Sequence, residues 1–92
     1  MTDIKAKITS LIKQISEDRE VIMTNLDPEL KCRLVSFFDW VSLLIHGIKK
    51  QSEDEINHEF FCIESRVSST LIARIKTNTM EIIRLRESLS TQ

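Results

Sequence analysis

The chain has 92 residues, enough for one domain with a single modest core and too few for two. It contains one glycine and one proline, far below their average frequencies of about 7% and 5%, which disfavours a sheet with its many turns and predicts an all-helical domain over residues 1–92. Thirteen basic and 14 acidic side chains give a net charge of −1, so no general attraction for nucleic acid or an anionic membrane is expected.

Residues 3–26 carry the pattern of an amphipathic helix. Apolar side chains recur every three or four residues, the spacing of one helix face, at Ile4, Ile8, Leu11, Ile15, Ile22 and Leu26. Asp18 occupies the one position in this stripe that is not apolar. The sequence leaves two interpretations of its carboxylate open: exposure at a local bend, or pairing with a base on another helix.

A second helix is predicted over residues 28–48. Its start is marked by a capping residue, Asp27, followed by Pro28 at the first helical position and by an acid in the first turn. Its end is less sharply defined. Gly47 before an apolar residue fits a glycine C-cap, whereas the two lysines that follow would suit a slightly later end.

The stretch 34–48 is apolar around most of its circumference, which is typical of a helix surrounded by several neighbours. Phe37 and Trp40 are predicted to lie in the core. Asp39 is the exception within this stretch, and we expect it on a narrow exposed strip together with Ser36 and Ser42. A second interpretation is that Asp39 pairs with an arginine of a partner chain and sets the register of an assembly.

A third, longer helix is predicted over residues 53–89, where no glycine or proline interrupts the chain. Ser52 and Glu55 have the spacing of a capping box at its start. The connection before it is short, which predicts that the second and third helices are antiparallel neighbours. Two weak points could kink or break this helix: the low-propensity residues 68–70, and Asn78 with its flanking threonines, where a break is the main alternative to a continuous helix.

The length of the third helix predicts association. It exceeds the other two by more than ten residues, so its C-terminal third is expected to lack a partner within the chain, and its aliphatic side chains would each forgo roughly 1.5–3 kcal/mol of burial. We therefore expect coiled-coil-like association, with a second copy as a homodimer or with a helical protein partner. The predicted partner-binding residues are Phe60, Phe61, Ile72, Ile83, Leu85 and Leu89.

The sequence offers little for catalysis or metal binding. One Glu-x-x-His pair, Glu55 and His58, matches half of what a two-metal helical bundle requires. A zinc site could be drawn only by combining residues of the second and third helices: His46, Asp54, His58 and Cys62. No nucleophile with a base and an orienting acid can be assembled, and no glycine-rich phosphate loop is present. The sequence therefore predicts a non-enzymatic protein with no cofactor, metal or small-molecule substrate.

Nucleic-acid binding is the main alternative. The C-terminal part of the chain carries five bases that could follow a phosphate backbone, Arg66, Arg74, Lys76, Arg84 and Arg86. Acids interrupt these bases, and no short turn precedes a recognition helix. A solvated charged face is therefore the favoured interpretation.

Two cysteines without CxxC spacing and no secretory signal favour a reducing compartment, the cytosol with the nucleus as an alternative. The longest apolar stretch has 15 residues and contains Asp39 and His46, whereas a membrane span needs about 20. The sequence thus predicts a small adaptor, chaperone-like or inhibitory binding protein that acts through an apolar helix face.

Overall fold

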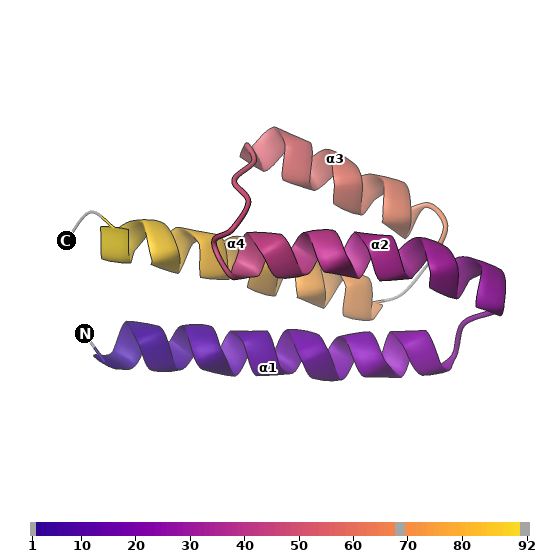
Figure 1. The fold of residues 1–92 in the computed structure, drawn as a ribbon, viewed down its shortest axis with the longest axis horizontal. Helices are drawn as coiled ribbons and strands as arrows, with labels where there is room; N and C mark the ends of the chain where they lie inside the picture. Colours follow the sequence, from indigo (N-terminus) through magenta and orange to yellow (C-terminus); the bar gives the residue numbers. More distant parts are fainter. Residues whose placement is uncertain (1, 68–69, 91–92) are drawn as a thin grey trace.

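The computed structural model describes residues 2–67 and 70–90, and these form four α-helices with no strand among them. α1 spans Thr2–Thr24, α2 Pro28–Ile45, α3 Glu53–Glu64 and α4 Thr70–Ser90. Successive helices run in alternating directions, so that α1 begins and α4 ends at the same end of the molecule (Figure 1). The predicted all-helical class is confirmed, whereas the predicted arrangement of three helices is wrong.

The third predicted helix is divided into α3 and α4. Arg66 and Val67 both donate their backbone N–H to the carbonyl of Ile63, at 2.9 and 2.8 Å, and this turn closes α3. The Ser65 hydroxyl donates to a carbonyl within the last turn, as serines do where they compete with helical bonding. Residues 68 and 69, part of one predicted weak point, lie outside the described residues, and α4 is already helical at Thr70.

The helix does not break near Asn78, the other predicted weak point. Asn78 lies inside α4, is 8% exposed, and donates its side-chain amide to the Gln14 side chain of α1 at 3.1 Å. A cap or turn at this position would sacrifice that buried hydrogen bond. The tertiary contact therefore outweighs the modest helix propensity of Asn78 and its neighbours.

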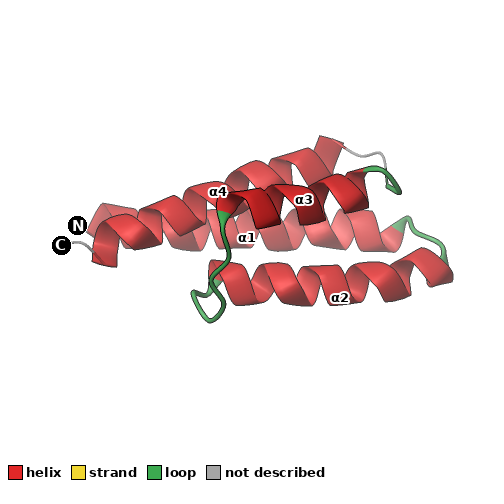
Figure 2. Ribbon diagram, turned by 90° about the horizontal axis from the view of Figure 1, so that it is seen from above, coloured by secondary structure: helices red, strands yellow, loops and turns green. Residues whose placement is uncertain are grey.

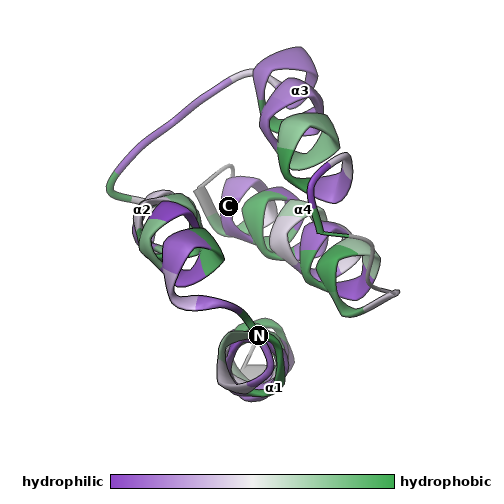
Figure 3. Ribbon diagram, turned by 90° about the vertical axis from the view of Figure 1, so that its right-hand side faces the viewer, coloured by the Kyte–Doolittle hydropathy of each residue, from purple (hydrophilic) through white to green (hydrophobic). Residues whose placement is uncertain are grey.

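α4 lies at the centre of the fold and packs against each of the other three helices. Viewed along the helices, α1, α2 and α3 are arranged around α4 (Figure 3). The core draws side chains from all four helices: Ile8, Ile15, Ile22, Leu34, Phe37, Phe38, Val41, Leu44, Ile45, Ile56, Phe60, Ile72, Ile75 and Ile82. The apolar stripe of α1 is thus buried or half-buried as predicted. The apolar stretch 34–48 is buried only in part, because Val35, Leu43 and Ile48 are exposed and Trp40 is half-buried.

An ion pair across the antiparallel α1–α4 seam resolves the two interpretations of Asp18. Its carboxylate is 3% exposed and accepts two hydrogen bonds from Arg74, one from Nε at 2.8 Å and one from Nη2. These bonds, and then the negative charge itself, raise the pKa of Arg74. Asp18 therefore pairs with a base on another helix, and this pair and the Asn78–Gln14 bond both join α1 to α4.

α2 and α3 run in opposite directions, as predicted, but they meet through side chains only. The ring of Phe60 stands edge-on to that of Phe37, with centroids 5.0 Å apart, and lies 6.0 Å from that of Trp40. The connection between the two helices reaches from one to the other as an extended loop (Figure 2). Trp40 is half-buried and donates its indole N–H to Gln51 in this loop.

The local start signals of α2 and α3 are confirmed. α2 begins at Pro28, although the Asp27 side chain forms no capping hydrogen bond. At α3, the Ser52 hydroxyl accepts from the Glu55 backbone at 3.2 Å while the Glu55 carboxylate accepts from Ser52, which completes the capping box. The hydrogen bonds from the Ser52 side chain and backbone lower the pKa of Glu55. The cap is therefore fully formed above the ordinary glutamate pKa and weakens as the pH falls through the lowered value.

Gly47 ends α2. It adopts φ +73°, donates to the Leu44 carbonyl at 3.1 Å, and is followed by Ile48, which donates to the Leu43 carbonyl at 2.9 Å. This is the Schellman pattern of hydrogen bonds. α2 itself ends at Ile45, three residues before the predicted boundary, and the glycine C-cap rather than the later lysines marks the end.

We expect Gly47→Ala to lower the free energy of unfolding by about 1 kcal/mol, because alanine is disfavoured at positive φ. A Cβ at this position would meet Arg86 Cδ at 3.6 Å, which is an ordinary contact, so the loss is conformational rather than steric. Gly47→Asn is the matched control, since asparagine tolerates this conformation better, and its loss should be smaller. Chemical denaturation of the two variants checks this. Equal losses would contradict the conformational explanation.

Candidate protein-binding surfaces

The six predicted partner-binding residues do not form one surface. Phe60 and Ile72 are 0% exposed and belong to the core. Ile83, Leu85 and Leu89 are half-buried and pack against the core. Only Phe61, at 69% exposure, is openly accessible.

The expectation that the C-terminal third of the third helix lacks a partner in the chain is wrong. The break before Thr70 allows α4 to turn back and lie along α1, and the two helices have similar lengths of 21 and 23 residues. The aliphatic side chains of α4 that were expected to be exposed therefore find most of their burial within the chain.

The seam between α1 and α2 contains a groove that the sequence did not predict. α1 packs much more closely along α4 than along α2. On the less closely packed side, a hollow of about 270 Å³ lies between the two helices, with an apolar lining of Met23, Val35 and Phe38 and a charged rim of Arg19, Glu20 and Asp39. Val35 is 48% exposed.

A second hollow of about 70 Å³ continues this groove toward the end of α2. It shares Arg19 and Phe38 with the first. Its remaining lining is mainly aliphatic, with serines and a histidine at the edge: Ile12, Ile15, Ser16, Val41, Ser42, Ile45 and His46. We name the two adjoining hollows together the α1–α2 groove.

Helical spacing explains the composition of the groove. Arg19 and Met23 are four residues apart on α1, and Val35, Phe38 and Asp39 are three and four apart on α2, so each set lies on one helix face. Asp39 is exposed, as are Ser36 and Ser42, which confirms the predicted polar strip of α2. The sequence singled out Asp39 correctly but gave no sign that Arg19 lies across a groove from it.

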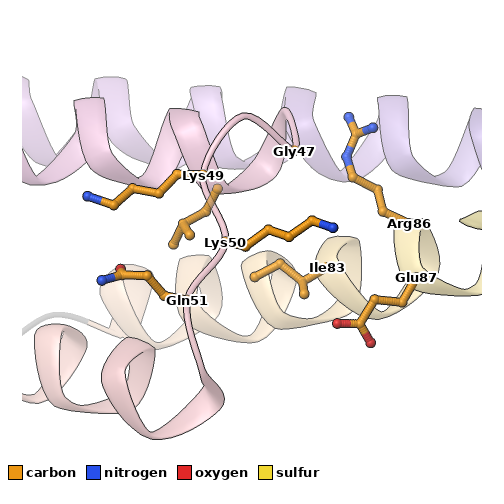
Figure 4. A pocket seen from close by; sticks show the side chains of 8 residues that line it. Gly47, Lys49, Lys50, Gln51, Ile83, Arg86 and Glu87 are labelled. Atoms are coloured by element: carbon orange, nitrogen blue, oxygen red, sulfur yellow. The ribbon is translucent and has the colours of Figure 1, made fainter.

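A cavity of about 130 Å³ lies between the α2–α3 connection and α4 (Figure 4). Leu44 and Ile83 contribute apolar surface, and three bases and one acid surround them, Lys49, Lys50, Arg86 and Glu87. Arg86 Nε donates to the Ile45 carbonyl at 2.7 Å and thereby gives a hydrogen-bond donor to a backbone carbonyl in the last turn of α2. In Figure 4 the amino groups of Lys49 and Lys50 point in opposite directions. Because the positive groups do not converge, we assign no anion site to this cavity.

The five bases of the nucleic-acid alternative are not gathered on one free surface. Arg74 is bound to Asp18, Arg84 pairs with Glu81 at 2.8 Å, and Arg86 is bound to the Ile45 carbonyl. Arg66 lies in the turn after α3. On α4, Arg74 and Lys76 point to nearly opposite sides, because successive helical residues are rotated by about 100°.

The residues weighed for a metal site are also separated. His58 Nε2 and Cys62 Sγ approach to 3.7 Å on the exposed face of α3. Over residues 2–67 and 70–90, no group of three or more histidine, cysteine or acidic side chains is placed to hold a metal ion. Both cysteines are free and exposed.

Two further observations bear on function. None of the described helices combines the length and the apolar character that crossing a bilayer requires. Comparison with protein-family models, with characterised proteins and with solved structures finds no match to this chain.

Proposed function

We propose that this protein is a non-enzymatic protein-binding module that receives an amphipathic helix in the α1–α2 groove. The observation that carries the proposal is the continuity of two hollows with an apolar floor and a polar rim along one helix–helix seam. The proposal keeps the apolar helix face expected from the sequence and moves it from α3 and α4 to α1 and α2.

The shape of the groove favours a helical ligand. α1 and α2 are antiparallel (Figure 1), and the lining of the two hollows runs from Ile12 to Met23 on α1 and from Val35 to His46 at the end of α2, so the groove is elongated along the seam. Elongated grooves between helices typically bind an amphipathic helix whose apolar side chains repeat at three- and four-residue spacing. Side chains of a docked helix could cover Val35 and Met23, which remain partly in contact with solvent.

The chemistry of the rim favours binding over catalysis. Arg19, Glu20 and Asp39 are charged groups that can orient a polar edge of a ligand. The only other titratable group of the groove, His46, lines the smaller hollow at the far end. In this arrangement the apolar floor would contact the apolar side of a ligand, and the charged rim would favour ligands with complementary polar groups.

Site-specific photo-cross-linking tests the proposal. Benzoylphenylalanine would replace Val35 in the groove, Phe61 on the exposed face of α3, and Thr77 on α4 as a background position. We expect cross-links from position 35 to map to the apolar face of a helix in the captured protein, and to exceed those from positions 61 and 77. Cross-linking from position 61 alone, or equal cross-linking at all three, would contradict the groove as the binding site.

A further inference from the structure

We infer, on the basis of the proposed function, that the helix received by the α1–α2 groove is α2 of a second copy of this chain. The two copies would be related by a two-fold axis, and each would place the outer face of α2 against the groove of the other. The inference rests on the charges at the two rims of the groove, Arg19 on α1 and Asp39 on α2.

Among the described residues, Asp39 has no ion-pair partner and Arg19 has only a long, exposed one. Over residues 2–67 and 70–90, Asp39 takes part in no ion pair. Arg19 approaches only the neighbouring Glu20, at 3.9 Å, and both side chains are largely exposed. Exposed pairs of this kind contribute little, about 0–1 kcal/mol, so Arg19 is available to another acid.

The α1 rim carries Arg19 beside Glu20 and the α2 rim carries Asp39, so the base on one rim can meet the acid on the other rim of a second copy. In a two-fold dimer the same patch is used twice, so a contact from Arg19 of one copy to Asp39 of the other is repeated in the reverse sense. Asp39, which has no ion pair among the described residues, and Arg19, whose contact with Glu20 is exposed and 3.9 Å long, would thus form two intermolecular pairs. A surface with two like-charged rims would repel its own copy.

The outer face of α2 has the form needed to enter the groove. Val35, at 48% exposure, lies beside Asp39 and presents an apolar side chain. Ser36 and Ser42 are exposed on the same side and are small, so they permit close approach of another helix. The segment from Leu34 to Ile45 contains no base, so any base that pairs with Asp39 comes from outside this segment.

Complementary charge reversal tests the inference directly. Sedimentation equilibrium would compare the wild type with Arg19→Glu, Asp39→Arg and the double variant. Each single reversal places like charges opposite one another twice per dimer, and we expect it to weaken dimerisation by about tenfold or more. The double variant restores opposite charges across the interface and is expected to return to within about threefold of the wild type.

Matched controls separate a specific interface from a general effect of charge. Arg66→Glu and Glu59→Arg change the net charge by the same amounts at exposed positions away from the groove, and should leave dimerisation unchanged. Circular dichroism of every variant checks that the helices are retained. Val35→Asp places a charge in the apolar part of the same surface and should abolish the dimer while preserving the fold.

Three outcomes would overturn the inference: a wild type that remains monomeric up to about 0.5 mM, dimerisation that the reversals do not affect, or a double variant as weak as the single ones. A monomer that still cross-links through position 35 to a different helical protein would overturn the second copy as ligand but leave the proposed function in place. Dimerisation through another surface, with no cross-linking at position 35, would contradict both.

Discussion

Replacing Phe60 by alanine is expected to lower the free energy of unfolding by about 3–4 kcal/mol, whereas the same change at the adjacent Phe61 should cost less than about 0.5 kcal/mol. Phe60 is 0% exposed and its ring packs edge-on against Phe37, 5.0 Å between centroids. Removing it would leave a cavity where α3 meets α2. Phe61 is 69% exposed and leaves no such cavity.

Urea denaturation followed by circular dichroism measures both changes, and it does not depend on the fluorescence of Trp40, which lies beside Phe60. The two variants are matched in composition, in helix and in propensity, so their difference reports position alone. Equal losses would mean that α3 does not fold back onto α2.

The two phenylalanines also show why the candidate site could not be predicted from sequence. Apolar residues at helical spacing require burial, but the pattern is the same whether the partner is another helix of the chain or a different molecule. Phe60 and Ile72 were predicted as partner-binding residues on this pattern and are core residues. Whether such a residue lies in the core or in an interface depends on where the chain turns back, and that is a property of the tertiary structure.

Signals confined to a few residues were predicted well. Pro28, Gly47 and the Ser52–Glu55 pair mark helix ends through steric limits and hydrogen bonds between close neighbours, and all three act as expected. The break between α3 and α4 was not predicted as the preferred outcome. Weak helix propensity occurs both before Thr70 and around Asn78, and only the buried contact of Asn78 with Gln14 distinguishes them.

The α1–α2 groove arises from unequal packing distances, for which a sequence carries no direct signal. α1 is held close to α4 by Asp18 and Gln14, which bind side chains of α4. No hydrogen bond or ion pair of this kind joins the described side chains of α1 and α2. A groove can therefore remain on the α2 side of α1 without disturbing the core.

Replacing Asp18 by asparagine is expected to lower the free energy of unfolding by about 2 kcal/mol. The carboxylate is 3% exposed and accepts both hydrogen bonds from Arg74, while an amide would turn one donor toward the guanidinium and remove the charge that the arginine faces. Asp39→Asn is the matched control, because Asp39 also lies in an apolar stretch but is exposed and forms no ion pair with the described residues. At low protein concentration, its loss should be within about 0.5 kcal/mol.

A double variant, Asp18→Leu with Arg74→Met, separates the stability of the ion pair from its role in specifying the register of α1 against α4. Leucine continues the apolar stripe of α1 at the position that Asp18 interrupts, and it removes the cost of burying the carboxylate. The Arg74 side chain is 51% exposed, so methionine there buries no charge and leaves none unpaired. We expect this variant to recover most of the stability that Asp18→Asn loses. If the pair also sets the register, the protection of backbone amides against hydrogen exchange along α1 and α4 should nevertheless be lower in the double variant. An uninterrupted apolar stripe would permit shifted pairings of the two helices. Recovered stability with unchanged protection would show that the core alone determines how α1 and α4 align.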